Sequence, residues 1–357
     1  MKKSYLLMAA AATIFAACSE TDLVNPVYEA QNEIGFENHV GKTTRAEITS
    51  EAALAKEGGF VVWGWKTPTA ETLDWSTTTQ IFNEVNVYDA STELGEKGDA
   101  TVWTYANKKY WDKTSTYNFY AAAPVDPEHG AYSCTDAATG MITITGVQSA
   151  LAADSDDFLI DRDGVTEVDG DGTHEKVGFE FNHVMAKVTL KLVCGALNEG
   201  DKITVTKLTM TGWDNGIGKF VQEFNETPEA TDNIDEWTID GDTEFKAEYT
   251  GSFELGADAT AETCVLTSYI MVPQAIAAST LKFTVDFTIT YGAGGSENFI
   301  GHEGTLATAQ TWGTDTHTTY TIKVGPQPIE FDVTSVNGFT NKYPGTDNPN
   351  AGDLPIE

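Results

Sequence analysis

The later half of the chain is dominated by a strict alternation of apolar and polar residues. The alternation runs through residues 184–192 and 281–291, and through shorter stretches at 320–324 and 329–333. A period of two places alternate side chains on opposite faces of an extended chain, so one face of each stretch is apolar. Residues 292–295 are rich in glycine and predict a turn. These stretches therefore predict β-strands that each bury one face.

The earlier half contains strands of a different kind. Residues 60–65 and 117–123 are apolar on both faces, and the second run stops at Pro124, so both predict strands buried between two layers. A helical period is only weakly present, at residues 50–56. Many short strands with polar turns predict an all-β fold, and the length of 357 residues suggests two β-sandwiches in tandem. We place them at residues 46–176 and 177–357.

The N-terminal segment has the anatomy of an export signal. Lys2 and Lys3 precede an apolar core of about 14 residues, shorter than the roughly 20 that span a membrane. Small residues then lead to Cys18, which resembles a lipobox cysteine that is acylated and becomes the first mature residue. The alternative is a plain signal cleaved after Ala17. The acidic stretch 19–22 resembles the surface-export tag of lipoproteins in Gram-negative gut and oral anaerobes, so we expect the outer face of the outer membrane.

Composition narrows the possible partners. Lys and Arg total 21 against 54 Asp and Glu, a formal net charge of -33, which would repel a phosphate backbone and excludes nucleic acid as an expected partner. Hydrophobic residues make up 41% and aromatic residues 11%, enough to form a core. Beyond Cys18 the cysteines are Cys134, Cys194 and Cys264, with no C-x-x-C pair. We expect small buried hydrophobes, with one long-range disulfide as the alternative.

Candidate catalytic and metal motifs are incomplete. His302-Glu303 begins like a zinc-protease helix, but Leu306 stands where the second histidine is needed. Residues 161–164 and 169–172 resemble calcium loops without the alternating ligands or the closing glutamate. His183 falls on the outward phase of the strand predicted at 184–192 and suggests a structural role. We expect no catalytic, cofactor or metal site, and no enzyme activity.

Several phrases along the chain resemble the fimbrillin family, the pilins of type V pili. They are the lipobox, Thr44-Arg45-Ala46, Val62-Trp63-Gly64-Trp65, Lys109-Tyr110-Trp111, Tyr117-Asn118-Phe119-Tyr120, Asp157-Phe158-Leu159 and Phe181-Asn182-His183-Val184. The resemblance implies two tandem transthyretin-like, Greek-key β-sandwiches. It also implies a lipoprotein precursor, cleavage between Arg45 and Ala46 by an arginine-specific protease, and polymerisation by strand exchange.

The residues suggest which segments would exchange. Residues 19–45 would be the removable leader, in which Ile34 and Phe36 alternate with Gly35 and Glu37 as a strand does. The incoming strand would come from the C-terminal region of another subunit, with Ile329, Phe331 and Val333 as the best candidates. The same stretch could instead be the last strand of its own sandwich. The expected partners are other pilin subunits, the protease, the outer membrane through the lipid, and host glycans or proteins.

A second function class competes with assembly. A surface-anchored lipoprotein that binds glycans without polymerising would use tryptophans as a sugar-stacking platform. The tryptophans are Trp63, Trp65, Trp75, Trp103, Trp111, Trp213, Trp237 and Trp312. Large aromatic residues in β-sandwiches more often belong to the core, and Trp63 and Trp65 share one face of a strand that is apolar on both sides. The sequence therefore favours a fimbrial subunit.

Overall fold

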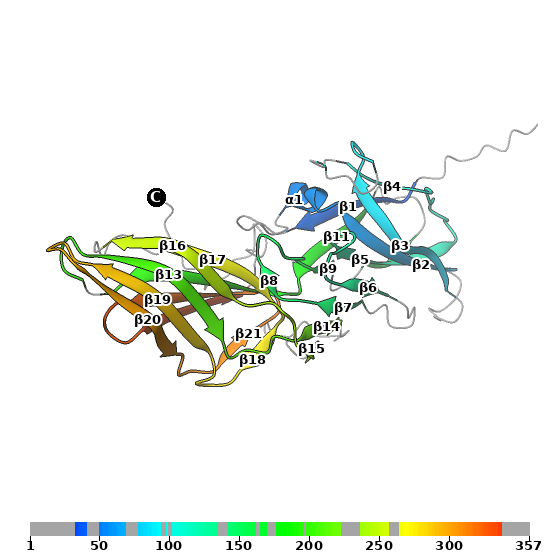
Figure 1. The fold of residues 1–357 in the computed structure, drawn as a ribbon. Coiled ribbons are helices and arrows are strands. Elements are labelled where there is room, and N and C mark those ends of the chain that lie inside the picture. Colours follow the sequence, from blue (N-terminus) through cyan, green and yellow to red (C-terminus); the bar gives the residue numbers. More distant parts are fainter. Residues whose placement is uncertain are drawn as a thin grey trace, which may run out of the picture.

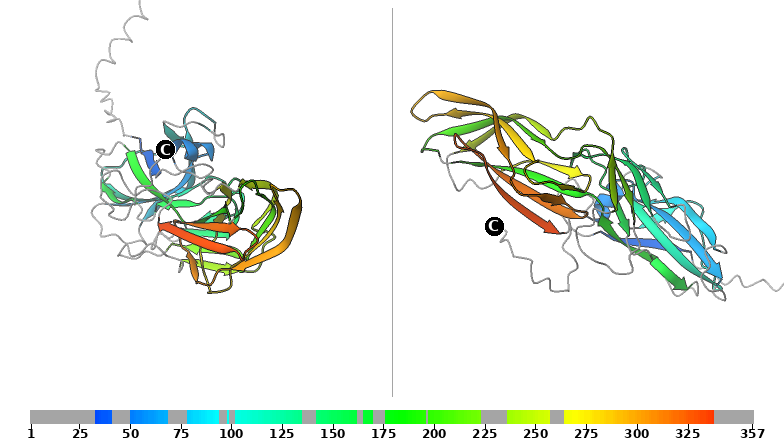
Figure 2. Two further views of the ribbon diagram at one scale, coloured as in Figure 1. Left: turned by 90° about the vertical axis from the view of Figure 1, so that its left-hand side faces the viewer. Right: turned by 90° about the horizontal axis from the view of Figure 1, so that it is seen from below.

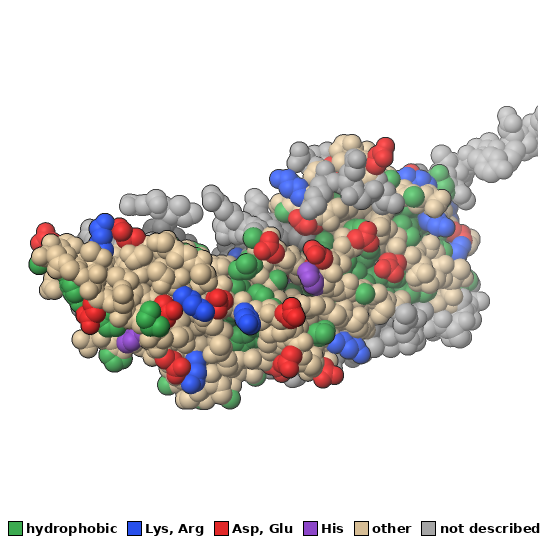
Figure 3. Space-filling view, in the orientation of Figure 1, with side chains coloured by type: hydrophobic (Ala, Val, Ile, Leu, Met, Phe, Trp, Pro, Cys, Tyr) green, Lys and Arg blue, Asp and Glu red, His purple; other side chains and the backbone are tan. Residues whose placement is uncertain are grey.

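The computed structural model shows a nearly all-β protein, elongated and built from two lobes (Figures 1 and 2). It describes residues 33–40, 50–68, 78–93, 98, 102–134, 142–161, 165–169, 176–195, 197–222, 236–256 and 264–337. Acidic and basic side chains are scattered over both lobes on the face drawn in Figure 3. The all-β prediction is confirmed.

The first lobe is organised around one large, curled sheet. Its strand order is β1-β11-β9-β5-β2-β3-β4, with β10 also paired to β5. The elements are β1 (Gly35–Val40), β2 (Phe60–Pro68), β3 (Thr79–Asp89), β4 (Trp103–Tyr105), β5 (Ser115–Ala123), β9 (Leu159–Asp161), β10 (Val165–Asp169) and β11 (Lys176–His183). The curl brings the two end strands of the sheet, β1 and β4, close together. The Tyr105 hydroxyl of β4 donates to the Ile34 carbonyl, just before β1, at 2.8 Å. An aromatic-rich core fills the inside of the curl.

The single helix of the described residues, α1 (Glu51–Lys56), covers part of this core. It begins at Ser50, whose side chain accepts a hydrogen bond from the Ala53 backbone at 3.1 Å, a standard N-cap contact. Leu54 and Ala55 are buried in the same cluster as Phe36 of β1. The helix predicted from the weak helical period at residues 50–56 is thus confirmed.

Strand β2 is buried on both faces, as its continuous apolar run predicts. Phe60 and Val62 face the inside of the curl, whereas Val61, Trp63 and Trp65 face a second core. That second core lies against a small sheet with the order β15-β14-β7-β6. Its strands are β6 (Ala131–Ser133), β7 (Thr143–Val147), β14 (Ile217–Val221) and β15 (Trp237–Asp240).

The second lobe is a sandwich of two sheets with the orders β23-β22-β12-β17-β8 and β16-β13-β19-β20, beside a short pair β18-β21. The strands are β8 (Ala150–Leu151), β12 (Ala186–Cys194), β13 (Lys202–Thr211), β16 (Glu248–Gly256), β17 (Cys264–Met271), β18 (Gln274–Ile276), β19 (Lys282–Thr290), β20 (Ser296–Thr305), β21 (Gln310–Trp312), β22 (Thr316–Val324) and β23 (Glu330–Asn337). Buried and less buried positions alternate along β19 and β22. The period of two in the sequence thus predicts these faces.

The pairing of strands does not follow the expected division at residue 176. Strand β11 begins at Lys176 and belongs to the first sheet. The β14–β15 hairpin, from the later half of the chain, pairs with β7, and β8 from the earlier half pairs with β17. Each lobe is therefore completed by strands from the other half of the sequence. Periodicity locates strands but carries no information on their partners.

His183 differs from the expectation that it faces outward. It closes β11, where Phe179, Phe181 and His183 share the buried phase, and its side chain is fully buried. Its Nδ1 lies 2.9 Å from a carboxylate oxygen of the buried Asp157. The outward assignment was wrong because the chain leaves β11 at Val184 before β12 starts at Ala186, which breaks the phase. Its structural role stays a prediction.

The cysteines of the described residues fit the small-hydrophobe expectation in part. Cys134 is buried and free, and Cys194 is partly buried and free. Burial raises the pKa of the Cys134 thiol to about 12, so it stays protonated near neutral pH. The side chain of Cys264 lies outside the described part of the structure.

Candidate strand-exchange groove

The N-terminal strand β1 lies in a slot between two parts of the first lobe. On one side it pairs in parallel with β11, in a register that runs from Gly35 opposite Lys176 to Val40 opposite Phe181. On the other side the Ile34 amide donates to the Lys109 carbonyl at 2.9 Å. The strand thus closes the curled sheet, and Figure 1 shows it in blue next to β11 and α1.

Phe36 of β1 and Ile34 just before it pack into the aromatic core of that sheet. Ile34 is 0% exposed and Phe36 is 2% exposed, whereas Glu37 points to solvent. The rings around Phe36 have centroids 5.3 Å (Phe82), 5.4 Å (Tyr105), 5.8 Å (Phe179) and 6.0 Å (Phe119) from its own. Edge-to-face and offset pairs of this kind each contribute about 0.5–1.5 kcal/mol beyond area burial. Phe36 is therefore the main anchor of β1.

Tyr105 joins the leader to the wall of the slot. Its hydroxyl donates to the Ile34 carbonyl and accepts from the Lys109 amide at 3.1 Å. Burial raises the pKa of Tyr105 to about 12, so the hydroxyl keeps its proton at neutral pH. Lys108 adds an ion pair to Glu33 at 2.6 Å and lies 4.5 Å from the centre of the Tyr105 ring. This side of the slot therefore binds the backbone of Ile34 and the charge of Glu33, the two residues just before β1.

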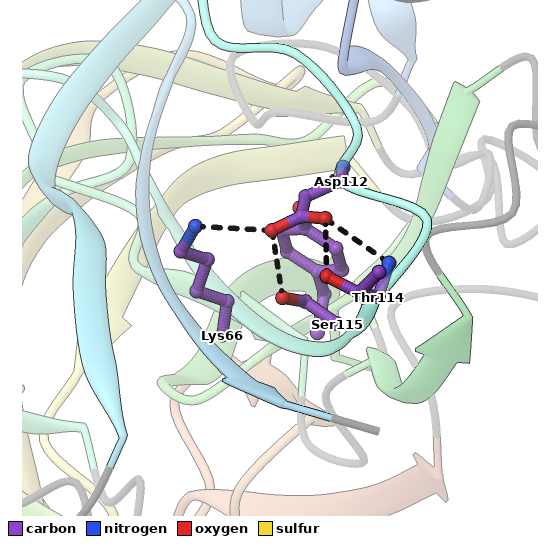
Figure 4. Close-up of polar contacts among 5 residues, drawn as sticks. Lys66, Asp112, Thr114 and Ser115 are labelled. Carbon is purple, nitrogen blue, oxygen red and sulfur yellow. Dashed lines mark hydrogen bonds and ion pairs between the residues drawn. The ribbon is translucent and has the colours of Figure 1, made fainter. Parts of the chain in front are cut away.

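A turn built around Asp112 holds that wall in place (Figure 4). One carboxylate oxygen accepts from the Thr114 amide at 3.0 Å and from the Thr114 hydroxyl at 2.7 Å. The other accepts from the Ser115 hydroxyl at 3.0 Å and from the Lys66 ammonium at 3.4 Å. These bonds, those from Thr114 above all, lower the pKa of Asp112 to about 2. The turn connects the wall at Lys109 to strand β5.

The sequence-predicted processing residues are placed only by chain order. Cys18, Arg45 and Ala46 lie outside the described residues. In the sequence, Arg45 stands between the end of β1 at Val40 and the cap of α1 at Ser50. A cut there would leave β1 joined to the first lobe only by non-covalent contacts.

The candidate exchanging residues belong to a strand of their own lobe. Ile329 precedes β23, and Phe331 and Val333 lie within it; β23 pairs antiparallel with β22 at the edge of its sheet. Ile329 is 9% exposed, and Phe331 packs partly buried against Phe283 with ring centroids 5.1 Å apart. Within this single chain, the alternative assignment as the last strand of its own sandwich therefore holds. In Figure 2 this strand has the reddest colour.

Other candidate chemistry finds no support among the described residues. No group of three or more metal-ligating side chains occurs in them, and none of their helices is long and apolar enough to cross a membrane. Most residues of the two acidic loops that resemble calcium motifs, 161–164 and 169–172, lie outside the described residues. His302 and Glu303 lie on strand β20, where His302 contacts the Gln327 carbonyl at 3.1 Å.

The wall residues Tyr105, Lys109 and Asp112 were not identified from sequence as parts of the slot. Lys109-Tyr110-Trp111 resembles a fimbrillin phrase, but its composition does not predict a contact with β1. Nothing local in the sequence indicates that this loop meets a strand more than sixty residues earlier, since Tyr105 contacts Ile34 across a sequence separation of 71. Such a contact arises from the closure of the whole sheet.

Comparison with known proteins agrees with this architecture. Residues 44–338 match the model of a family described as fimbrillin-like. The fimbrium subunit Fim1C of Phocaeicola vulgatus is 26% identical over 236 residues, which cover 59% of this chain and 56% of that relative, so the match spans just over half of its length. The crystal structure of a fimbrial protein from Bacteroides vulgatus shares the fold with a TM-score of 0.60 at 18% identity, over 86% of this chain and 99% of that one. The chain belongs to the fimbrillin-like family.

Proposed function

We propose that the protein is a subunit of a cell-surface fimbria of the type V class that serves adhesion. It is exported as a lipoprotein acylated at Cys18, cut between Arg45 and Ala46 by an arginine-specific protease, and joined to other subunits by strand exchange. The role is structural and involves no catalysis. One observation carries the proposal: β1 lies upstream of Arg45 and yet fills a slot in a sheet that lies downstream of it.

A slot that has lost β1 is lower in free energy when another strand fills it than when it is left empty. Without β1, the edge of β11 would present unpaired N–H and C=O groups above an apolar, aromatic floor. Burial of a large apolar side chain stabilises by about 1.5–3 kcal/mol, so leaving the sites of Ile34 and Phe36 empty is costly. A strand from another subunit would satisfy both the backbone and the floor.

The incoming strand would come from the C-terminal region of another subunit. Ile329, Phe331 and Val333 remain our candidates, because β23 lies at the edge of its sheet and alternates in the same way as β1. Exchange then requires β23 to leave β22. Its edge position means that only one ladder of hydrogen bonds has to break.

The rival function, a glycan-binding lipoprotein that does not polymerise, is less well supported. Among the described tryptophans, Trp213 is partly exposed and the others are buried: Trp63, Trp65, Trp103, Trp111, Trp237 and Trp312. A buried indole cannot stack on a sugar. These residues serve the cores, which favours the fimbrial subunit.

The substitution Arg45→Ala tests the activation step. We expect a full-length, lipidated precursor at the cell surface and few polymers, because β1 would stay attached to its own slot. Intact mass and N-terminal sequencing of sheared surface protein measure the cut, and a start at Ala46 is expected for the unchanged chain. Lys42→Ala is the matched control and should be processed normally. Abundant normal filaments built from the Arg45→Ala chain would remove proteolytic activation from the proposal.

A further inference from the structure

We infer that the strand replacing β1 is residues 329–332 of a second copy of this chain, in one defined register. Ile329 would take the place of Ile34, and Phe331 the place of Phe36. The inference rests on the proposed function and deepens it, because it states which side chain enters which site. It also makes the slot selective for a partner with a particular pattern.

The two strands carry the same pattern at the positions that matter. Ile34-Gly35-Phe36-Glu37 and Ile329-Glu330-Phe331-Asp332 both place isoleucine two residues before phenylalanine and follow it with an acid. In both strands, the isoleucine and the phenylalanine pack into a core while the acid faces solvent. The incoming strand would therefore fit the slot without a change of phase.

Burial favours the transfer. In its own lobe Ile329 is 9% exposed and Phe331 is only partly buried, whereas Ile34 and Phe36 are 0% and 2% exposed in the slot. The same two side chains are thus covered more completely by the aromatic floor than by the edge of their own sheet. The apolar burial of these two side chains would increase when β23 moves into the slot of a neighbour.

The register also creates a charge pair that the leader cannot make. Gly35 lies opposite Lys176 of β11, and both positions are on the outward face. In the exchanged state Glu330 would occupy the position of Gly35, with its carboxylate beside the ammonium of Lys176. Although β1 and β11 are parallel, side chains at paired positions on one face still lie close together, so opposite charges attract and like charges repel. In its own lobe Glu330 pairs with Lys323 at 2.7 Å in an exposed contact that water screens.

A charge exchange in the full chain tests the register without disturbing either core. We expect Lys176→Glu and Glu330→Lys each to lower the rate of polymer formation about twofold to fivefold, because each opposes like charges across the new pair. The double variant should return to within about twofold of the unchanged chain. The readout is the half-time of denaturant-resistant ladders after cleavage, at low salt, and the differences should shrink in 1 M sodium chloride.

The variant Lys323→Glu is the matched control. Glu330→Lys also removes the pair with Lys323 in its own lobe, and Lys323→Glu removes that pair while leaving Glu330 and Lys176 unchanged. We expect Lys323→Glu to polymerise within about twofold of the unchanged chain. Restoration by the double variant supports the register. Polymers that form equally well from all variants overturn the register and leave strand exchange standing. Failure of the unchanged, correctly cut chain to polymerise overturns the proposed function itself.

Discussion

Strands β1 and β23 carry similar side chains but are held very differently. Strand β1 is also the end strand of its sheet and pairs with β11, but Ile34 just before it bonds to Lys109, and Phe36 is surrounded by aromatic rings. Strand β23 lies at a sheet edge beside β22 alone, with Phe331 partly exposed. The comparison teaches that depth of enclosure, more than side-chain pattern, decides which strand can leave its site. Under the proposed function, the more deeply buried β1 would leave only after a cut in the chain, whereas the less buried β23 would detach from β22.

The largest effect is expected from Phe36→Ala in the uncut chain. Removal of a fully buried phenylalanine ring costs about 3–5 kcal/mol of unfolding free energy, since transfer and cavity terms add. Denaturant unfolding monitored by tryptophan fluorescence measures it. The control is Glu37→Ala, an exposed neighbour on the same strand, which should change stability by less than about 0.5 kcal/mol. A cost below that of the control would mean that β1 does not depend on its anchor.

The substitution Phe331→Ala should cost less, about 1–3 kcal/mol, because its ring is partly exposed at the edge of the sheet. The same unfolding experiment gives the value. Comparison with Phe36→Ala tests the difference in enclosure directly. If the two losses were equal, β23 would be held as firmly as β1, and its release during exchange would lose its physical basis.

Acid should loosen the β23 side of the molecule through His317. Burial, with Lys187 and Lys191 nearby, lowers the pKa of His317 on β22 to about 4 from its ordinary value of 6.5. As the pH falls, His317 is protonated in the unfolded chain before it is protonated in the folded chain. The stability of the fold is therefore unaffected by His317 above pH 6.5 and decreases as the pH falls from 6.5 to 4. We expect a loss of about 1–2 kcal/mol over that window after allowance for partial exposure. The variant His317→Gln, compared at pH 7 and pH 4.5, should show a correspondingly shallower dependence.

The smallest effect is expected at the wall of the slot. Because the pKa of Asp112 is lowered to about 2 from 3.8, its ionised form stabilises the fold above pH 3.8, and this is lost between pH 3.8 and 2. The carboxylate is 39% exposed, so we expect Asp112→Asn to cost only about 1 kcal/mol at pH 7. Asp332→Asn, an exposed acid on β23, is the control. An equal cost at both positions would argue against a special role for the turn.

Much of the fold could be predicted from the chain because strand alternation is a local property. The buried faces of β19 and β22 and the double burial of β2 follow from side-chain order alone. The phase of His183 could not be predicted, since it depends on where β11 ends and β12 begins. The boundary near Lys176 could not be predicted either, because β7 pairs with a hairpin from the other half of the chain.

Local residue order was enough to predict the strand content, the shared phase of Ile34 and Phe36, the resemblance to fimbrillins and the candidate residues of the exchange. Only the tertiary structure decided that β1 pairs with β11, that Tyr105 and Lys109 form the opposite wall, and that β23 lies at an edge of its own sheet. The physical reason is that a period of two specifies which face of a strand is buried. Which strand lies beside it is set by contacts between residues far apart in the chain, which form only when the sheets close.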